Sequence, residues 1–373
     1  MSSVKDFSYA FSKHRNKVGG SYVSNGNSNA ATFVGTAMSK WITTSVTSLV
    51  GTFSSAIEMN SDLSKWTVGT VTTLGSTFKG ASKFVGTGLK LWDVSTVTSL
   101  AFTFYLAVEM NADLSGWQVG KVVTLEQTFR DASKFVGTDL TSWITASVTS
   151  LSATFRDARE MNSDLSKWNV AKVDTLYQTF LYATKFQGTG LDSWDTASVI
   201  TLYNTFAVAG EMNSDLSKWN VATVASLEGT FSGASKFVGT GLASWITTSV
   251  TNLDSTFKGA SEMNADLSGW NVANVKTLGH TFYGASKFKG TGLNLWDIAN
   301  VVSGQMVDTF TSTTSLTSCN KRNIADVWAA ASDPGGSTFT DTTYETVWMS
   351  LPWCIGTMLT DITFKQASWG TFN

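Results

Sequence analysis

The sequence has few of the residues that build most catalytic and metal centres. Of its 373 residues, two are histidine and two are cysteine. His14 and His280 have no partner pattern, and no glycine-rich phosphate loop, metal-ligand spacing or nucleophile elbow is present. We therefore expect no enzyme, no metal and no cofactor. Cys319 and Cys354 both lie near the C-terminus. We expect a disulfide between them, with two buried thiols as the alternative.

Charge and long hydrophobic runs are also scarce. Charged residues make up 14% of the chain and the formal net charge is −2, whereas a nucleic-acid binder would show a basic face. No apolar run approaches the ~18–20 residues that span a bilayer. The first twenty residues contain no hydrophobic signal-peptide segment. We expect neither nucleic-acid binding nor membrane insertion. With 42% hydrophobic residues and 15 tryptophans, the chain has ample material for a core.

An internal repeat is the strongest signal in the sequence. One tryptophan recurs at intervals that alternate between 25 and 26 residues, so the full unit is a 51-residue pair of coils. A Thr-Phe pair follows the same period. The tryptophans stand at positions 41, 66, 92, 117, 143, 168, 194, 219, 245, 270 and 296. A period of this length lies within the range of leucine-rich repeats, about 20–29 residues.

Each coil carries apolar residues around its whole circumference. Leu63, Trp66 and Val68 have the Leu-x-x-Leu-x-Leu spacing that predicts a short strand. Further apolar residues, from Val71 to Phe84, recur every three or four positions and predict a short helical turn. One coil cannot bury all of these residues alone, but stacked coils can share a continuous core.

These patterns predict a repeat solenoid of the α/β to mainly β class. We expect a right-handed leucine-rich-repeat-like stack of about eleven coils. It would occupy residues 31–310, after an N-terminal lead or cap at 1–30 and before a C-terminal cap at 311–373. The segment "NKRNIADVWAAA" predicts a short helix in that cap.

The repeat phrase F/M-N-x-D-L-S-x-W-x-V-x-x-V-x-x-L resembles that of BspA-like leucine-rich-repeat surface proteins of bacteria and protists. The resemblance covers roughly residues 31–310, and "LTSCNKRNIADVW" resembles the helical cap of algal and protist members. It implies an extracellular or cell-surface protein that acts in adhesion and protein interaction, without established enzymatic activity. It does not imply a particular ligand.

Charge alternates along the repeat at the residue before each Met or Phe. Equivalent positions in a stack lie about 4.8 Å apart, so we expect every Glu to lie between two Lys and to hold the coils in register. The residues are Glu58, Lys83, Glu109, Lys134, Glu160, Lys185, Glu211, Lys236, Glu262 and Lys287.

The two kinds of coil turn differently. In the Glu-type coil, Asn60 and Asp62 can accept hydrogen bonds from backbone amides, and calcium binding is the alternative role for this phrase. In the Lys-type coil, Gly88 can adopt a positive φ, and Asp139 replaces this glycine in one coil.

Two hydroxyl ladders run along the stack. One consists of the Thr before each Phe, from Thr52 to Thr281, and the other precedes most Leu positions, from Ser48 onward. Such ladders usually satisfy backbone groups. If the Thr ladder faced solvent, ice or mineral binding would be an alternative function.

The residue after each tryptophan is the predicted ligand-contacting row, because side chains alternate across a strand. The row lacks clustered Tyr, Trp or Arg, so we expect weak contacts multiplied along the array. The partner would be a protein or glycan at a surface, and the alternative is a structural subunit that self-assembles. The row consists of Ile42, Thr67, Asp93, Gln118, Ile144, Asn169, Asp195, Asn220, Ile246, Asn271 and Asp297.

Overall fold

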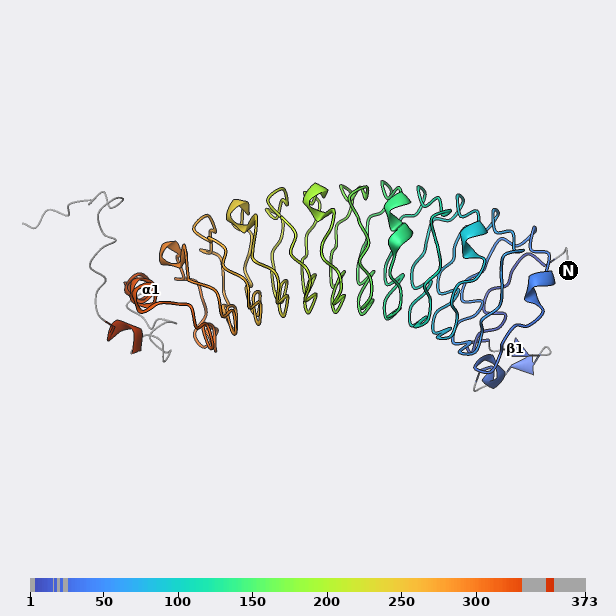
Figure 1. Ribbon diagram of the computed structural model, residues 1–373, viewed down its shortest axis with the longest axis horizontal. Helices are drawn as coiled ribbons and strands as arrows, with labels where there is room; N and C mark the ends of the chain where they lie inside the picture. Colours follow the sequence, from blue (N-terminus) through green and yellow to red (C-terminus); the bar gives the residue numbers. More distant parts are fainter. Residues whose placement is uncertain (1–3, 16, 19–20, 23–25, 331–346, 352–373) are drawn as a thin grey trace, which may run out of the picture.

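The repeats form one long, bowed stack of coils, with the N-terminus at one end and a helix at the other (Figure 1). The computed structural model describes residues 4–351 apart from 16, 19–20, 23–25 and 331–346. Equivalent residues of successive coils lie side by side, joined by isolated parallel bridges such as those from Thr73 to Ser99 and from Ser99 to Thr124. The repeat nature of the chain is therefore confirmed.

Regular secondary structure is sparse. Strands β1 (Lys17–Val18) and β2 (Ser21–Tyr22) form an antiparallel pair near the N-terminus. Helix α1 (Ser318–Ala330) covers the segment expected to be helical. The remaining elements are short 3₁₀ turns: η1 (Ser28–Ala30), η2 (Met38–Lys40), η3 (Leu89–Leu91), η4 (Thr138–Ser142), η5 (Leu191–Ser193), η6 (Leu242–Ser244) and η7 (Leu293–Leu295). No helix among the described residues is both long and apolar enough to cross a membrane.

The predicted leucine-rich-repeat solenoid of the α/β to mainly β class is wrong. Within the described ranges, β1 and β2 are the only strands, and they lie outside the repeats. The predicted strand at Leu63–Val68 is absent, because these residues form turns and irregular backbone. The coils are held together by hydrogen bonds between turns rather than by a sheet.

Alternating amide directions explain why the coils pair without strands. The amides of Ser76 and Phe78 donate to the next coil, at Ala101 and Thr103, with N···O distances of 2.9 Å each. The amide of Thr77, which lies between them, instead donates to the carbonyl of Leu74 in its own coil, at 3.0 Å. In a strand inside a sheet, every second residue would pair with the strand on one side, and the residues between them would pair with the strand on the other side. Here the neighbours close tight turns, so the backbone is not extended.

Two aromatic columns fill the core. In the middle of the stack, neighbouring tryptophans such as Trp117 and Trp143 stack with centroids 6.2 Å apart. Phenylalanines such as Phe104 and Phe129 stack at 5.6 Å. Each of these side chains is at most 2% exposed. The indole Nε1 of Trp117 donates to the carbonyl of Leu89 in the preceding coil at 2.8 Å. Each tryptophan therefore both fills the core and ties two coils together.

The alternation of coil types has a structural counterpart along the convex edge in Figure 1, where the turns η3 to η7 lie. Gly88 precedes η3 with a φ of 92°, as the sequence predicts. Asp139 does not adopt a positive φ. Of the two left-handed positions of this turn, Gly86 and Gly88 in the coil of η3, only the equivalent of Gly86 is kept, as Gly137 with a φ of 75°, and the longer turn η4 forms. Asp139 thereby avoids the strain of left-handed backbone.

Both ends of the stack are covered. Residues 5–13 add one further row to the first coil, with the amides of Phe7 and Tyr9 donating to Ser48 and Val50 at 3.0 and 2.8 Å. At the other end, the indole of Trp328 in α1 stacks on Trp296 at 6.4 Å. Cys319 lies at the start of α1, whereas Cys354 lies outside the described residues, so their bond stays a prediction.

Candidate interaction surface

The Glu–Lys ladder consists of separate pairs. Four glutamates each form an ion pair with the lysine 25 residues later, at N···O distances of 2.6–3.0 Å. Glu109 lies between Lys83 and Lys134 of the adjacent coils, as predicted, but it pairs only with Lys134: among the described contacts none joins Lys83 to Glu109 or its equivalents across the 26-residue step. An ammonium group that is about 60% exposed gains little from a second carboxylate. The pairs are Glu58–Lys83, Glu109–Lys134, Glu211–Lys236 and Glu262–Lys287.

The Thr ladder faces the core, which removes the premise of ice or mineral binding through it. Thr77 and its equivalents from Thr52 to Thr281 have no exposed surface. The Thr77 hydroxyl donates to the carbonyl of Leu74 in its own coil, at 2.7 Å, and lies 3.0 Å from that of Leu49 in the preceding coil. The ladder therefore satisfies backbone carbonyls where successive coils meet.

Other polar repeats also serve the backbone. Thr73, in the ladder before Leu, accepts the amide of Gly75 at 3.1 Å. Asn60 accepts the amide of Val85 in the next coil, at 3.1 Å, and Asp62 accepts that of Ser64, at 2.8 Å. The turn-capping interpretation of the Asn-x-Asp phrase is confirmed, because the oxygens considered for calcium are bound to amides.

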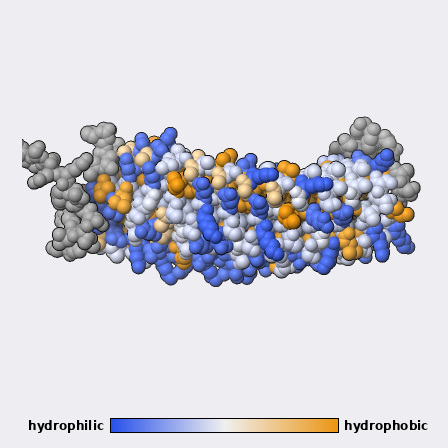
Figure 2. All heavy atoms as spheres, turned by 90° about the horizontal axis from the view of Figure 1, so that it is seen from above, coloured by the Kyte–Doolittle hydropathy of each residue, from blue (hydrophilic) through white to orange (hydrophobic). Residues whose placement is uncertain are grey.

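The row after the tryptophans is exposed in every coil, as predicted. Six of its polar members accept the amide two residues later, which closes a local turn and occupies one side-chain oxygen. These are Asp93, Asn169, Asp195, Asn220, Asn271 and Asp297. Ile42, Ile144 and Ile246 are 59–67% exposed but stand four coils apart. Figure 2 shows the convex edge, where hydrophobic groups are scattered among hydrophilic ones.

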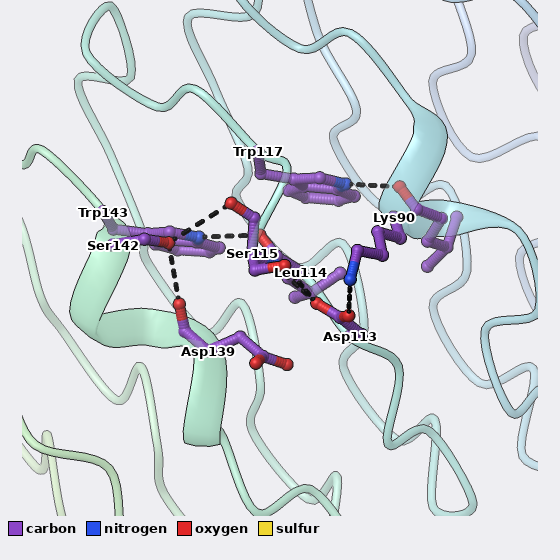
Figure 3. Close-up of polar contacts among 9 residues, drawn as sticks. Lys90, Asp113, Leu114, Ser115, Trp117, Asp139, Ser142 and Trp143 are labelled. Atoms are coloured by element: carbon purple, nitrogen blue, oxygen red, sulfur yellow. Dashed lines mark hydrogen bonds and ion pairs between the residues drawn. The ribbon is translucent and has the colours of Figure 1, made fainter.

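One charged cluster occurs where Asp139 replaces the usual glycine (Figure 3). Asp113 accepts hydrogen bonds from Lys90 at 2.5 Å and from the amide of Ser115 at 2.9 Å. The Lys90 ammonium, followed by Ser115, holds the pKa of Asp113 well below its usual value. Burial, together with the nearby Asp113 carboxylate, raises the pKa of Asp139.

The two aspartates therefore sit in unlike environments, which is a property of acid–base pairs in enzymes. Their surroundings supply little else. The side chains of Lys90 and Asp113 are 59% and 40% exposed, and Asp113 is already bound to Lys90 and Ser115. The described residues contain no group of three or more potential metal ligands. This cluster is a local clamp between neighbouring coils. The absence of enzymatic activity stays a prediction.

A different surface, which the sequence did not lead us to expect, concentrates partly exposed tyrosine and arginine side chains. It lies on the corner formed by Leu-x-x-Thr-Phe-x-x-Ala. In each coil the residue before Thr and the residue four positions later have left-handed backbone, for example Ser76 and Gly80, with φ of 56° and 69°. These turns push the variable residues of the corner outward, because the Thr and Phe between them point into the core.

We call the central part of this corner the arginine–tyrosine patch. It contains four of the eight tyrosines and three of the five arginines of the chain. Its members are partly exposed and come from five consecutive coils. They are Phe102, Tyr105, Leu106, Arg130, Asp131, Arg156, Asp157, Arg159, Tyr177, Tyr182 and Tyr203.

Contacts between coils fix the side chains of the patch. The Arg130 guanidinium lies 5.1 Å from the ring centroid of Tyr105 and donates to Gln127 at 2.9 Å. The Arg156 guanidinium donates to Gln178 in the next coil at 2.6 Å. The rings of Tyr177 and Tyr203 stack with centroids 5.2 Å apart and planes 8° apart. Little rotamer freedom remains to be lost when a partner binds.

Acidic side chains neutralise the arginines of the patch. The Nε atoms of Arg130 and Arg156 lie 3.3 and 3.5 Å from the carboxylates of Asp131 and Asp157. Burial, followed by repulsion from Asp157, raises the pKa of Asp131. Arg159 is more open, with a side chain that is 64% exposed. The patch is therefore aromatic and close to neutral.

The repeat region matches one described family. The family is described as "Mycoplasma protein of unknown function, DUF285", and it matches residues 22–117, 72–191, 98–216, 149–241 and 200–323. These overlapping segments cover more than half of the chain. The chain belongs to the DUF285 family. No curated protein and no solved structure matches it. The result agrees with the repeat architecture, whereas the finer assignment to BspA-like surface proteins stays a prediction.

A signal for the patch was present in the DUF285 repeats. The conserved letters of each coil are apolar or hydroxylated, and they fix the core and the turns. The residues next to Thr-Phe on both sides differ from coil to coil. For example, Ser76 in one coil corresponds to Phe102 in the next, and Lys79 corresponds to Tyr105. Comparison of these variable positions would have revealed that Tyr and Arg concentrate in five neighbouring coils.

Proposed function

We propose that this DUF285 protein is a non-enzymatic interaction protein that binds a protein partner through the arginine–tyrosine patch. The proposal places its action at a cell surface or outside the cell, in line with the resemblance of its repeats to surface proteins. The observation that carries it is the concentration of partly exposed tyrosine and arginine side chains on five adjacent coils. Tyrosine and arginine are among the residues that dominate binding energies at protein interfaces.

Backbone conformation supports the same surface. The second left-handed position of the corner is glycine in three successive coils after the patch, Gly233, Gly259 and Gly284. In the five coils that contribute to the patch it is held by non-glycine residues. These are Leu106, Asp131, Asp157, Tyr182 and Val208, with φ between 57° and 60°. Left-handed backbone costs a residue other than glycine roughly 1–2 kcal/mol. The same position is also held by Ser55 and Ser312 toward the ends of the stack, so this strain is concentrated in the coils of the patch without being confined to them.

The row after the tryptophans is the competing surface, and a matched pair of variants separates the two. The patch variant is Tyr177→Ser, Tyr182→Ser and Arg159→Ala, three side chains that are 40–64% exposed. The control variant is Asn169→Ala, Asp195→Ala and Asn220→Ala, which removes three members of the row.

Wild type and both variants are immobilised and exposed to extracellular proteins of the source organism, and a retained protein is then purified and titrated against all three by calorimetry. We expect the purified partner to bind the wild type and the control variant, with at least tenfold weaker binding to the patch variant. Equal affinity for the patch variant, or loss only in the control variant, would refute the assignment of function to the patch.

A further inference from the structure

The tyrosine stack of the patch ends at an open position. Four equivalent residues follow one another along the corner: Glu126, Ser152, Tyr177 and Tyr203. Their register is fixed by the amides of Gln127, Ala153 and Gln178, which donate to the carbonyls of Ser152, Tyr177 and Tyr203. The Tyr177 ring stacks on Tyr203 on one side, and on the other side its neighbour in the row is a serine.

Ser152 leaves this row without a ring next to Tyr177. Stacked rings in neighbouring coils of this protein have centroids about 5–6 Å apart, as for Tyr177–Tyr203 at 5.2 Å and Phe129–Phe155 at 5.7 Å. A ring in the Ser152 row would continue this spacing and lie within the ~4.5–7 Å range of favourable aromatic pairs. Tyr177 is 40% exposed.

Most polar groups around this position are bound to one another, although the Nε atoms of Arg130 and Arg156 have only an ion-pair contact and no hydrogen bond. Arg156 donates to Gln178, and its Nε faces Asp157. Arg130 donates to Gln127, whose amide lies 3.4 Å from Glu126. A sugar ring presents many hydroxyl groups that need free donors and acceptors. An aromatic side chain needs little more than a flat surface and van der Waals contact, and the guanidinium groups beside it favour a π-system.

We propose that the partner inserts an aromatic side chain of a protein above Ser152, where it stacks on the free face of Tyr177. This inference rests on the proposed function of the patch and names the chemistry that the patch recognises. The inserted ring extends the pair Tyr177–Tyr203 to three members. The site selects for a flat ring on the partner, and against a charged or aliphatic group.

The test uses N-acetyl-tyrosinamide as the probe, titrated into the full chain and followed by NMR. N-acetyl-leucinamide is the aliphatic control and a chito-oligosaccharide is the sugar control. Ser152→Tyr should fill the open position from within the chain. Ala101→Tyr is the matched control, because it adds the same ring to the same row two coils away, where no tyrosine stack exists. Tyr177→Leu keeps an apolar side chain but removes the ring.

We expect the tyrosine probe to bind the wild type and the Ala101→Tyr variant. Its affinity should fall at least tenfold in Ser152→Tyr and in Tyr177→Leu, and the leucine probe should not bind. Binding that survives in both Ser152→Tyr and Tyr177→Leu would overturn the inference, as would no binding of the tyrosine probe to the wild type or preferential binding of the sugar. Each of these outcomes leaves the partner titration of the patch variant unaffected, so the proposed function is judged separately.

Discussion

The coils of the patch and the coils that follow it share a core but differ at one backbone position. From residue 101 to residue 208 the second left-handed position carries Leu106, Asp131, Asp157, Tyr182 and Val208, whereas the next three coils carry glycine there. The glycines are not required by crowding. A Cβ on Gly259 would lie 3.7 Å from its nearest neighbour outside adjacent residues, which is ordinary contact.

This difference separates scaffold from function. Glycine is the residue that left-handed backbone favours, and the later coils show the unstrained solution. The patch retains side chains that strain the backbone, including the β-branched Val208, for which a positive φ is unusual. Leu106 and Tyr182 are 40% and 41% exposed, so core packing does not explain them. The proposed binding function would explain them, because a partner would bury these side chains.

The largest loss of stability is expected at the crowded glycines of the 3₁₀ turns, and the strained positions of the corner are compared with it. At Gly190 the φ is 90°, and a Cβ would overlap the backbone nitrogen of Ser166 in the preceding coil. We expect Gly190→Ala to lower the free energy of unfolding by about 3 kcal/mol or more, through steric overlap added to strain. Urea unfolding followed by tryptophan fluorescence measures it. A loss below that of Gly259→Val would show that the overlap relaxes easily.

An intermediate effect is expected when the later coils are made to resemble the patch. Gly259→Val places a β-branched residue at a φ of 70°, where its Cβ meets no closer neighbour than 3.7 Å. We expect a loss of about 1–2 kcal/mol in the free energy of unfolding, due to backbone strain alone. The control is Gly120→Ala, because a Cβ there would meet open space and Gly120 has no positive φ. Gly269→Ala would be unsuitable, because its Cβ would approach the carbonyl of Ala243. Equal stability of wild type and Gly259→Val would show that the left-handed position is not strained.

The smallest effect concerns charge within the patch. Burial and Asp157 raise the pKa of Asp131 above its unfolded value, so the folded state holds the proton more tightly. The protonated Asp131 carboxyl therefore contributes its full stabilisation below pH ~4, and this contribution is lost as the pH rises through the pKa of the folded state. Asp131→Asn should therefore gain stability relative to wild type at pH 7, within about 0.5 kcal/mol, and not at pH 3. Urea unfolding at both pH values tests this; a variant less stable at pH 7 would mean that the Arg130 ion pair dominates.

Much of the scaffold could be predicted from the sequence. The 25/26 alternation of the tryptophans predicted a stack, the burial of Trp and Phe, and the turn at Gly88, because a strict period allows few arrangements of the core. The fold class could not be predicted in this way. Alternating apolar residues are typical of strands, but at Leu63–Val68 a turn at residues 64–65 places Leu63, Trp66 and Val68 in the core without extended backbone pairing.

The candidate site was predicted less well. Exposure of the row from Ile42 to Asp297 was predicted correctly, since each member follows a buried tryptophan. Its polar side chains proved to close turns, which depends on hydrogen-bond geometry. Tyr177 and Tyr203 are 26 residues apart in the sequence, and only the stacking of coils brings their rings together.

The most direct test of the account is the free energy of unfolding of the triple variant Leu106→Gly, Tyr182→Gly and Val208→Gly. These residues have left-handed backbone and partly exposed side chains. If the patch keeps them for binding, the triple variant should be more stable than the wild type by about 1–3 kcal/mol in urea unfolding and should lose the partner. A triple variant that is less stable than the wild type would contradict the account, because these side chains would then contribute to the scaffold.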